Sequence, residues 1–178
     1  MRRILAAAAF LLAASPALAA APPGCSAQAI PDTPVKGVVN GKPFVVKQAT
    51  VTIEKGFAVN DVKFDSYDLM LEVDGIFNAL TTRVIVKDGT RADGRTFRVV
   101  DSGSIGDQPM AIAGTPEVQS WDLQLESAGV DTSFTQEAAS MRLEYGQRKG
   151  NVLPGKIVFC VPGQKAAIAG TFNALIGR

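Results

Sequence analysis

Residues Gly155 to Ile176 read GKIVFCVPGQKAAIAGTFNALI, two apolar runs separated by a turn sequence. Pro162 followed by Gly163 is typical of a type II turn, because glycine readily adopts the positive φ that the third position requires. Two-residue hairpins favour other turn types, so we expect a looser loop that extends through Lys165. This stretch predicts an antiparallel strand pair at the centre of a β-sheet, and neither strand carries an evident catalytic group.

The rest of the chain repeats this pattern of short strands between turns. The clearest alternation is Val118–Glu126, where Trp121, Leu123 and Leu125 share one face and polar residues occupy the other. The sequence predicts an all-β fold, an antiparallel two-sheet β-sandwich, with a closed β-barrel as the alternative. Further strand patterns occur at residues 38–39, 44–53, 67–73, 82–87, 96–100 and 140–145, with a hairpin turn at 40–41, a loop or helical turn at 76–80, a long loop at 101–116 and one helical turn at 135–139.

The N-terminus has the organisation of a secretory signal peptide. Arg2 and Arg3 precede an apolar run from Ile4 to Ala14, and Ala17-Leu18-Ala19 matches a cleavage site. We expect residues 1–19 to be removed, residues 20–35 to form an extended lead-in rich in Pro and Ala, and residues 36–178 to form one domain. The protein is therefore expected to be exported to the periplasm or the extracellular space, and no stretch is long and apolar enough for a transmembrane span.

Two cysteines, Cys25 and Cys160, are present. In an oxidising compartment such a pair predicts one disulfide, which in the chain-entropy model would contribute about 4–5 kcal/mol. Two unpaired thiols, or a lipid-anchored Cys25, are the alternatives.

The composition excludes several kinds of chemistry. There is no histidine, which excludes Ser-His-Asp and Cys-His nucleophile activation and histidine-based zinc sites. The formal net charge is only +1, so no bulk electrostatic attraction to nucleic acid is expected. We expect no cofactor and no metal.

One family resemblance lies in the C-terminal part. Residues 141–145, 153–157 and 169–174 resemble the C-terminal part of exported bacterial β-sandwich domains of unassigned function, and residues 39–44 resemble their opening hairpin. The resemblance implies the sandwich fold and brings no activity or site residues with it.

A second local resemblance concerns Asp101. The sequence Val-Val-Asp-Ser-Gly-Ser at residues 99–104 is similar to the catalytic loop of aspartic proteases, and residues 175–178 resemble their second motif. A single copy implies a homodimer in which two aspartates share a proton. The alternative is that Asp101 ends a strand with an Asx-type turn.

Charged and aromatic residues offer three other candidate sites. Arg91, Arg95 and Arg98 lie in a basic run that could bind an anion or a sugar acid, or could form a solvated face. Aspartates at 88, 93, 101 and 107 could bind calcium, although turn chemistry also explains them. Tyr67 and Trp121 could stack on a carbohydrate, but both fall on the apolar faces of their strands, which favours the core.

The sequence therefore favours an exported, non-catalytic binding or accessory module. We expect a monomer that contacts a protein or a saccharide through loops 74–81, 88–95 and 101–117 at one end of the sandwich. The alternatives are a dimeric aspartic-protease-like hydrolase that uses Asp101, and a structural envelope subunit that polymerises through an open edge strand.

Overall fold

The computed structural model describes residues 29–59, 62–75, 77–98, 118–133 and 136–177. These residues form eleven strands and two single-turn 3-10 helices, η1 and η2. Their bounds are β1 Lys36–Val39, β2 Lys42–Val45, β3 Gln48–Val59, β4 Val62–Glu72, β5 Asn78–Lys87, β6 Thr96–Arg98, β7 Val118–Leu125, η1 Glu126–Ala128, β8 Val130–Ser133, β9 Ser140–Tyr145, β10 Val152–Val161, η2 Pro162–Gln164 and β11 Ala166–Ile176.

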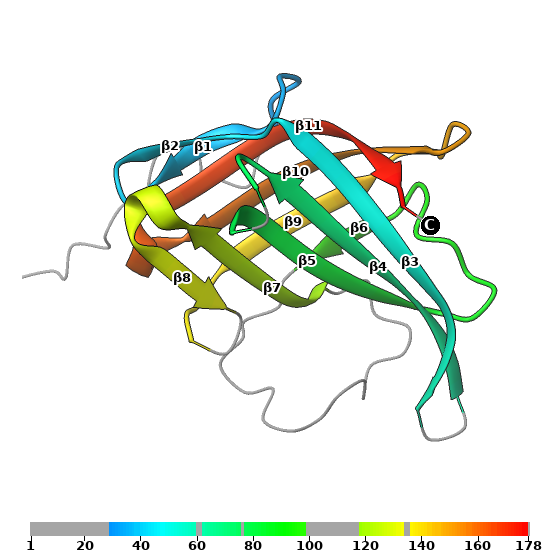
Figure 1. Cartoon of the computed structure of the whole chain (residues 1–178). Coiled ribbons are helices and arrows are strands. Elements are labelled where there is room, and N and C mark those ends of the chain that lie inside the picture. Colours follow the sequence, from blue (N-terminus) through cyan, green and yellow to red (C-terminus); the bar gives the residue numbers. More distant parts are fainter. Residues whose placement is uncertain (1–28, 60–61, 76, 99–117, 134–135, 178) are drawn as a thin grey trace, which may run out of the picture.

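The pairings join all eleven strands in one sheet, in the order β6-β9-β10-β11-β3-β4-β5-β7-β8, with β1 pairing to both β11 and β2. Figure 1 shows this sheet curving into an open half-barrel. The predicted all-β fold is confirmed, but one curved sheet is observed where the sequence predicted two. No pairing between β6 and β8 closes the sheet within the described ranges.

The sheet is continuous because β11 uses one edge for two different partners. Residues Ala167–Ala169 pair with β1 in antiparallel fashion. Further along, Leu175 and Ile176 pair with Thr50 and Val51 of β3 in parallel. This parallel link joins the strands β6-β9-β10-β11 to the strands β3-β4-β5-β7-β8, and strand patterns alone do not predict such a pairing.

The core lies on the concave side of the curved sheet. Trp121 of β7 packs edge-on against Phe159 of β10, with ring centroids 5.1 Å apart. Tyr145 of β9 approaches Tyr67 of β4 with ring centroids 6.3 Å apart. Trp121 and Tyr67 are 1% and 2% exposed, so their assignment to the core is confirmed and the stacking platform is wrong.

The predicted hairpin of β10 and β11 is present, and its register runs from Val152 opposite Leu175 to Val161 opposite Ala166. Its turn differs from the predicted type II turn. Residues Pro162–Gln164 form η2, and the left-handed conformation falls on Lys165 (φ 47°) rather than on Gly163. The looser loop through Lys165 is thus confirmed, because that residue closes the turn by donating its N–H to the Pro162 carbonyl at 3.0 Å.

Other strand boundaries also differ from the predicted ones. The predicted strand 44–53 is two strands, interrupted at Val46 and Lys47, and β5 begins at Asn78 rather than Thr82. Strand β8 was missed because its residues, VDTS, lack strong strand alternation. The predicted helical turn at 135–139 begins outside the described residues.

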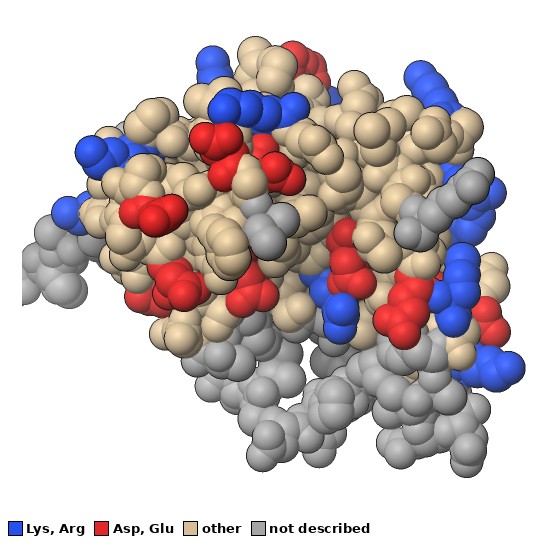
Figure 2. Space-filling model, viewed as in Figure 1, with Lys and Arg blue, Asp and Glu red and all other residues tan. Residues whose placement is uncertain are grey.

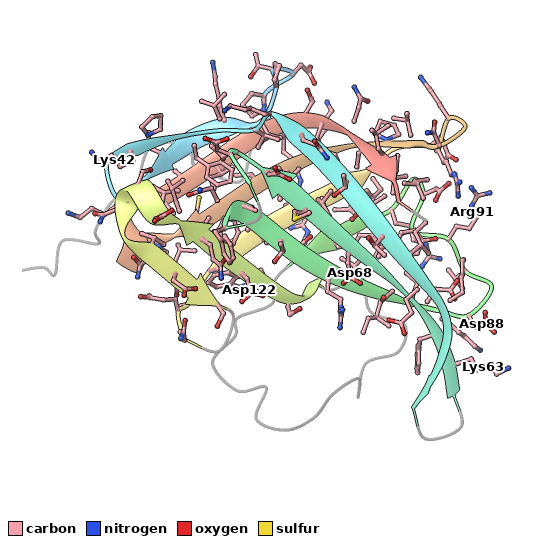
Figure 3. The ribbon with its side chains drawn as sticks, viewed as in Figure 1. Lys42, Lys63, Asp68, Asp88, Arg91 and Asp122 are labelled. Carbon is pink, nitrogen blue, oxygen red and sulfur yellow. The ribbon has the colours of Figure 1, made fainter. Side chains whose placement is uncertain are left out.

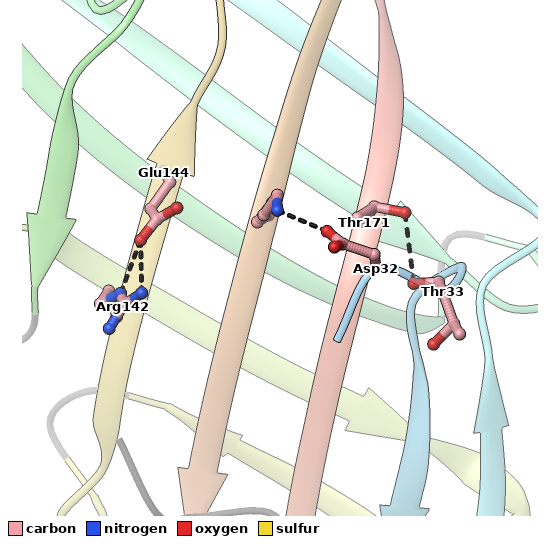
Figure 4. Close-up of polar contacts among 6 residues, drawn as sticks. Asp32, Thr33, Arg142, Glu144 and Thr171 are labelled. Atoms are coloured by element: carbon pink, nitrogen blue, oxygen red, sulfur yellow. Dashed lines mark hydrogen bonds and ion pairs between the residues drawn. The ribbon is translucent and has the colours of Figure 1, made fainter. Parts of the chain in front are cut away.

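The described lead-in lies along β11, where Pro34 forms a parallel bridge with Thr171. The Thr33 carbonyl accepts hydrogen bonds from the backbone N–H of Thr171 at 2.7 Å and from its hydroxyl at 3.2 Å. Asp32 pairs with Lys156 at 2.5 Å, as Figure 4 shows. The signal peptide predicted at residues 1–19 lies outside the described residues.

Cys160 is buried near the end of β10, on the strand face opposite Ile157, Phe159 and Val161. No free cysteine occurs in the described part of the chain. Since Cys25 lies outside that part, the Cys25–Cys160 bridge stays a prediction. Over the described ranges, no helix has the length and hydrophobicity needed to cross a bilayer.

Candidate functional site

Neighbouring carboxylates partly neutralise the basic run that contains Arg91, Arg95 and Arg98. Arg91, in the β5–β6 loop, forms an ion pair with Asp93 at 2.8 Å. Arg83 of β5 pairs with Asp68 of β4 at 2.5 Å. This ion pair raises the pKa of Arg83.

Arg95 and Arg98 are exposed on or near β6. Arg98 lies opposite Arg142 of β9, and Arg142 pairs with Glu144 at 2.6 Å on the same strand face (Figure 4). None of Arg91, Arg95 and Arg98 lines any of the grooves described below. The grooves formed by the described residues therefore do not bring these three arginines together.

Two other predicted sites lie wholly or partly outside the described residues. Asp101 and the loop 101–117 are outside them, so the aspartic-protease interpretation stays untested. The calcium interpretation also involves Asp101 and Asp107. Within the described ranges, no group of three or more acidic or cysteine side chains is arranged to hold a metal ion.

The remaining predicted loops do not share one end of the fold. Residues 74–77 precede β5 and residues 88–95 follow it, so a strand of 10 residues separates them, a length of about 33 Å. Figure 3 shows Asp88 and Arg91 at one end of the sheet and Lys42 at the other. Loop 88–95 is thus separated from the connections described next.

Four connections meet at the end where β5 begins, which we call the Asn78 end: Asn40-Gly41, the turn Val73–Gly75 with Phe77 and Asn78, Glu126–Gly129, and Pro162–Lys165. The Asn78 side chain donates to the Asp74 carbonyl at 3.0 Å and accepts from the Glu126 N–H at 2.9 Å. The Asn40 side chain donates to the Ala128 carbonyl at 3.1 Å, and its backbone N–H donates to the Gln164 carbonyl at 3.0 Å. Hydrogen bonds therefore tie all four connections together.

Phe77 is the most exposed aromatic side chain in this region, with 69% of its surface accessible. It lines a groove of about 510 Å³ together with Gln124, Glu126, Gly129, Val130 and Asp131, which we call the Phe77 groove. A second groove of about 470 Å³ is lined by Pro43, Lys47, Val73, Asp74, Asn78, Leu125, Glu126 and Ser127. Glu126 lines both grooves, so together they form an extended surface around η1.

The surface around the Phe77 groove is acidic. Asp131 accepts a hydrogen bond from the Gln124 amide at 3.3 Å, and Asp122 is exposed on the adjacent strand. Partial burial, and then repulsion from Asp131, raise the pKa of Asp122. Figure 2 shows carboxylates gathered over η1, β7 and β8, with basic side chains along the upper margin, and Figure 3 places Asp122 on β7.

A third groove, of about 370 Å³, lies over β9, β10 and β11 and is lined in part by Glu144, Lys156 and Asn173. Its lysine is already paired with Asp32. Contacts within the chain thus satisfy its main charge, whereas the Phe77 groove retains an exposed ring and exposed carboxylates.

Sequence reasoning singled out the loop that contains Phe77 but not the residue itself. A lone phenylalanine between Asp74-Gly75 and a strand has no periodic partner that would show which way it points. The sequence also gives no sign that Asn78 organises the loop, because both hydrogen-bond partners of its side chain are backbone groups.

No known protein-family model matches the chain, and neither a curated protein nor a solved structure is significantly similar to it.

Proposed function

We propose that the protein is an exported, non-catalytic binding module that contacts a protein or a saccharide through the Asn78 end. The observation that carries this proposal is an exposed aromatic ring, Phe77, on a loop that Asn78 holds by hydrogen bonds to Asp74 and Glu126. Exposing a large ring to water lowers the stability of a fold. An exposed ring that lines a groove together with exposed carboxylates supports recognition of a partner, because aromatic residues are enriched at binding surfaces.

The test is a binding screen of the purified mature protein against a glycan array and a synthetic peptide array. The Phe77→Ala substitution should lower the affinity for the identified ligand about tenfold, which is typical of the loss of an aromatic anchor. Leu175→Ala is the matched control, because Leu175 is also a large exposed apolar residue (50%) and lies near the far end of β11. It should leave binding unchanged.

Two outcomes would contradict the proposal. One is a ligand that still binds the Phe77→Ala variant but no longer binds Arg95→Ala or Arg98→Ala, which would place the site at the opposite end of β5. Hydrolysis of a peptide library that disappears in Asp101→Asn would show that the protein is an enzyme.

A further inference from the structure

The groove beside Phe77 has a lining that matches one class of ligand better than the others. Its walls come from the start of β5, from β7 and from β8, and they present one aromatic ring, one amide and two carboxylates. No lysine or arginine lines it. Among the described residues, neither Glu126 nor Asp131 has an ion-pair partner.

The hydrogen-bonding capacity of the groove is also one-sided. The carboxylates of Glu126 and Asp131 accept hydrogen bonds and donate none. The Gln124 amide donates to Asp131 at 3.3 Å, which directs its N–H toward a groove acceptor. The groove therefore offers negative charge and acceptors beside the face or edge of a ring.

A guanidinium or ammonium group complements this arrangement. Such a group is a donor without acceptor capacity, it pairs with carboxylates, and it is attracted to an aromatic face. Asp122, on the same face of β7 as Gln124, adds to the negative charge, and its pKa is raised first by partial burial and then by repulsion from Asp131. An external cation would relieve the repulsion between these two aspartates.

We propose that the Phe77 groove binds an arginine or lysine side chain from an exposed basic segment of a partner protein. The cation lies against Phe77 and pairs with Asp131 and Glu126. This inference rests on the proposed binding function and deepens it, because it selects a cationic protein segment over a neutral saccharide.

The experiment titrates the mature protein with the fluorescein-labelled peptide Gly-Arg-Gly-Arg-Gly and with the same peptide carrying citrulline at both arginine positions. Citrulline keeps the size of arginine but is uncharged, so it should bind about tenfold more weakly. Phe77→Ala and Asp131→Asn should each lower the affinity for the arginine peptide about fivefold. Asp131→Asn should also reduce the salt dependence of binding.

Two controls separate the groove from general effects. Asp93→Asn removes the same charge from the β5–β6 loop, where Asp93 pairs with Arg91, and should leave binding within about twofold of wild type if bulk attraction is minor. Leu175→Ala should do the same for loss of exposed apolar surface. Thermal melting of each variant confirms that the fold is retained.

Equal binding of the two peptides, or equal losses in Asp93→Asn and Asp131→Asn, would overturn the proposal. So would a failure of the arginine peptide to bind at millimolar concentration. If an oligosaccharide binds instead and requires Phe77, the cationic ligand is wrong while the binding function stands. If no arrayed ligand depends on Phe77, both fail.

Discussion

The buried hydroxyl of Tyr145 has no hydrogen-bond partner among the described residues. The same is true of two other buried polar atoms, Thr82 Oγ1 and Trp121 Nε1. Burial also raises the pKa of Tyr145. An unsatisfied buried hydroxyl destabilises the fold by the desolvation of that group. These atoms lie in the core, where sequence alternation places the residues correctly but cannot show whether each polar atom is satisfied.

Tyr145→Phe should therefore raise the free energy of unfolding by about 1 kcal/mol, because it removes the orphan hydroxyl and keeps the ring contacts. Chemical denaturation followed by circular dichroism measures the change. Ser66→Ala is the control, since the buried Ser66 hydroxyl does have a partner, Asp68, at 3.2 Å. That variant should lose stability, and a loss in both would contradict the prediction.

Asp122 gives the candidate site a pH dependence. Its pKa is raised above the ordinary value of 3.8, first by partial burial and then by Asp131. A raised carboxyl pKa means that ionisation opposes folding, so its contribution is favourable below pH 3.8 and is lost as the pH rises through the folded-state pKa.

Asp122→Asn should therefore stabilise the protein by about 0.5 kcal/mol near neutral pH, a size typical of exposed charges. The variant should match wild type below pH 3.8, where the carboxyl is protonated. Denaturant titrations at both pH values test this. Asp68→Asn is the opposite control, because it removes the ion pair with Arg83 and should destabilise at neutral pH.

At the scale of the elements, Gly170 marks the place where the edge of β11 passes from β1 toward β3. Its φ is 143°, and a β-carbon there would lie 2.5 Å from the Thr33 carbonyl oxygen and 2.7 Å from Val35 Cα. Both are backbone atoms of the segment that lies against β11, so neither can move aside cheaply. Only glycine fits at position 170, where the segment of Thr33 and Val35 lies against β11.

Gly170→Ala should lower the free energy of unfolding by about 3 kcal/mol, from backbone strain and overpacking together. Gly56→Ala isolates the first cause, because Gly56 also has a positive φ (65°) but has nothing within 4 Å of its β-carbon position. That variant should lose only about 1 kcal/mol. Equal losses of stability in the two variants would show that the backbone around Gly170 is not tightly packed.

A different glycine shows how much of the hairpin the sequence could reveal. Gly155 in β10 lies between Tyr145 of β9 and Phe172 of β11 in the two registers. A β-carbon there would meet the Phe172 ring and would lie 2.8 Å from the Glu144 carbonyl oxygen. The strand was predictable from its apolar alternation, whereas this tight packing depends on two neighbours far from it in the chain.

At the scale of the whole molecule, the fold follows from one sheet that packs against itself. Trp121 and Phe159 meet across the concave side, although the strands that carry them, β7 and β10, are separated by four others in the sheet. The alternation that predicted two facing layers was correct about which side chains face inward. It could not distinguish two sheets from one strongly curved sheet, since both bury the same residues.

Local patterning in the sequence was sufficient for the all-β class, the β10–β11 hairpin and the inward faces of β4, β7 and β9, because side-chain direction alternates with every residue in a strand. The parallel pairing of β11 with β3, the convergence of four connections on Asn78 and the exposure of Phe77 required the tertiary structure. Each depends on contacts between residues distant in the chain, and no local periodicity records such contacts.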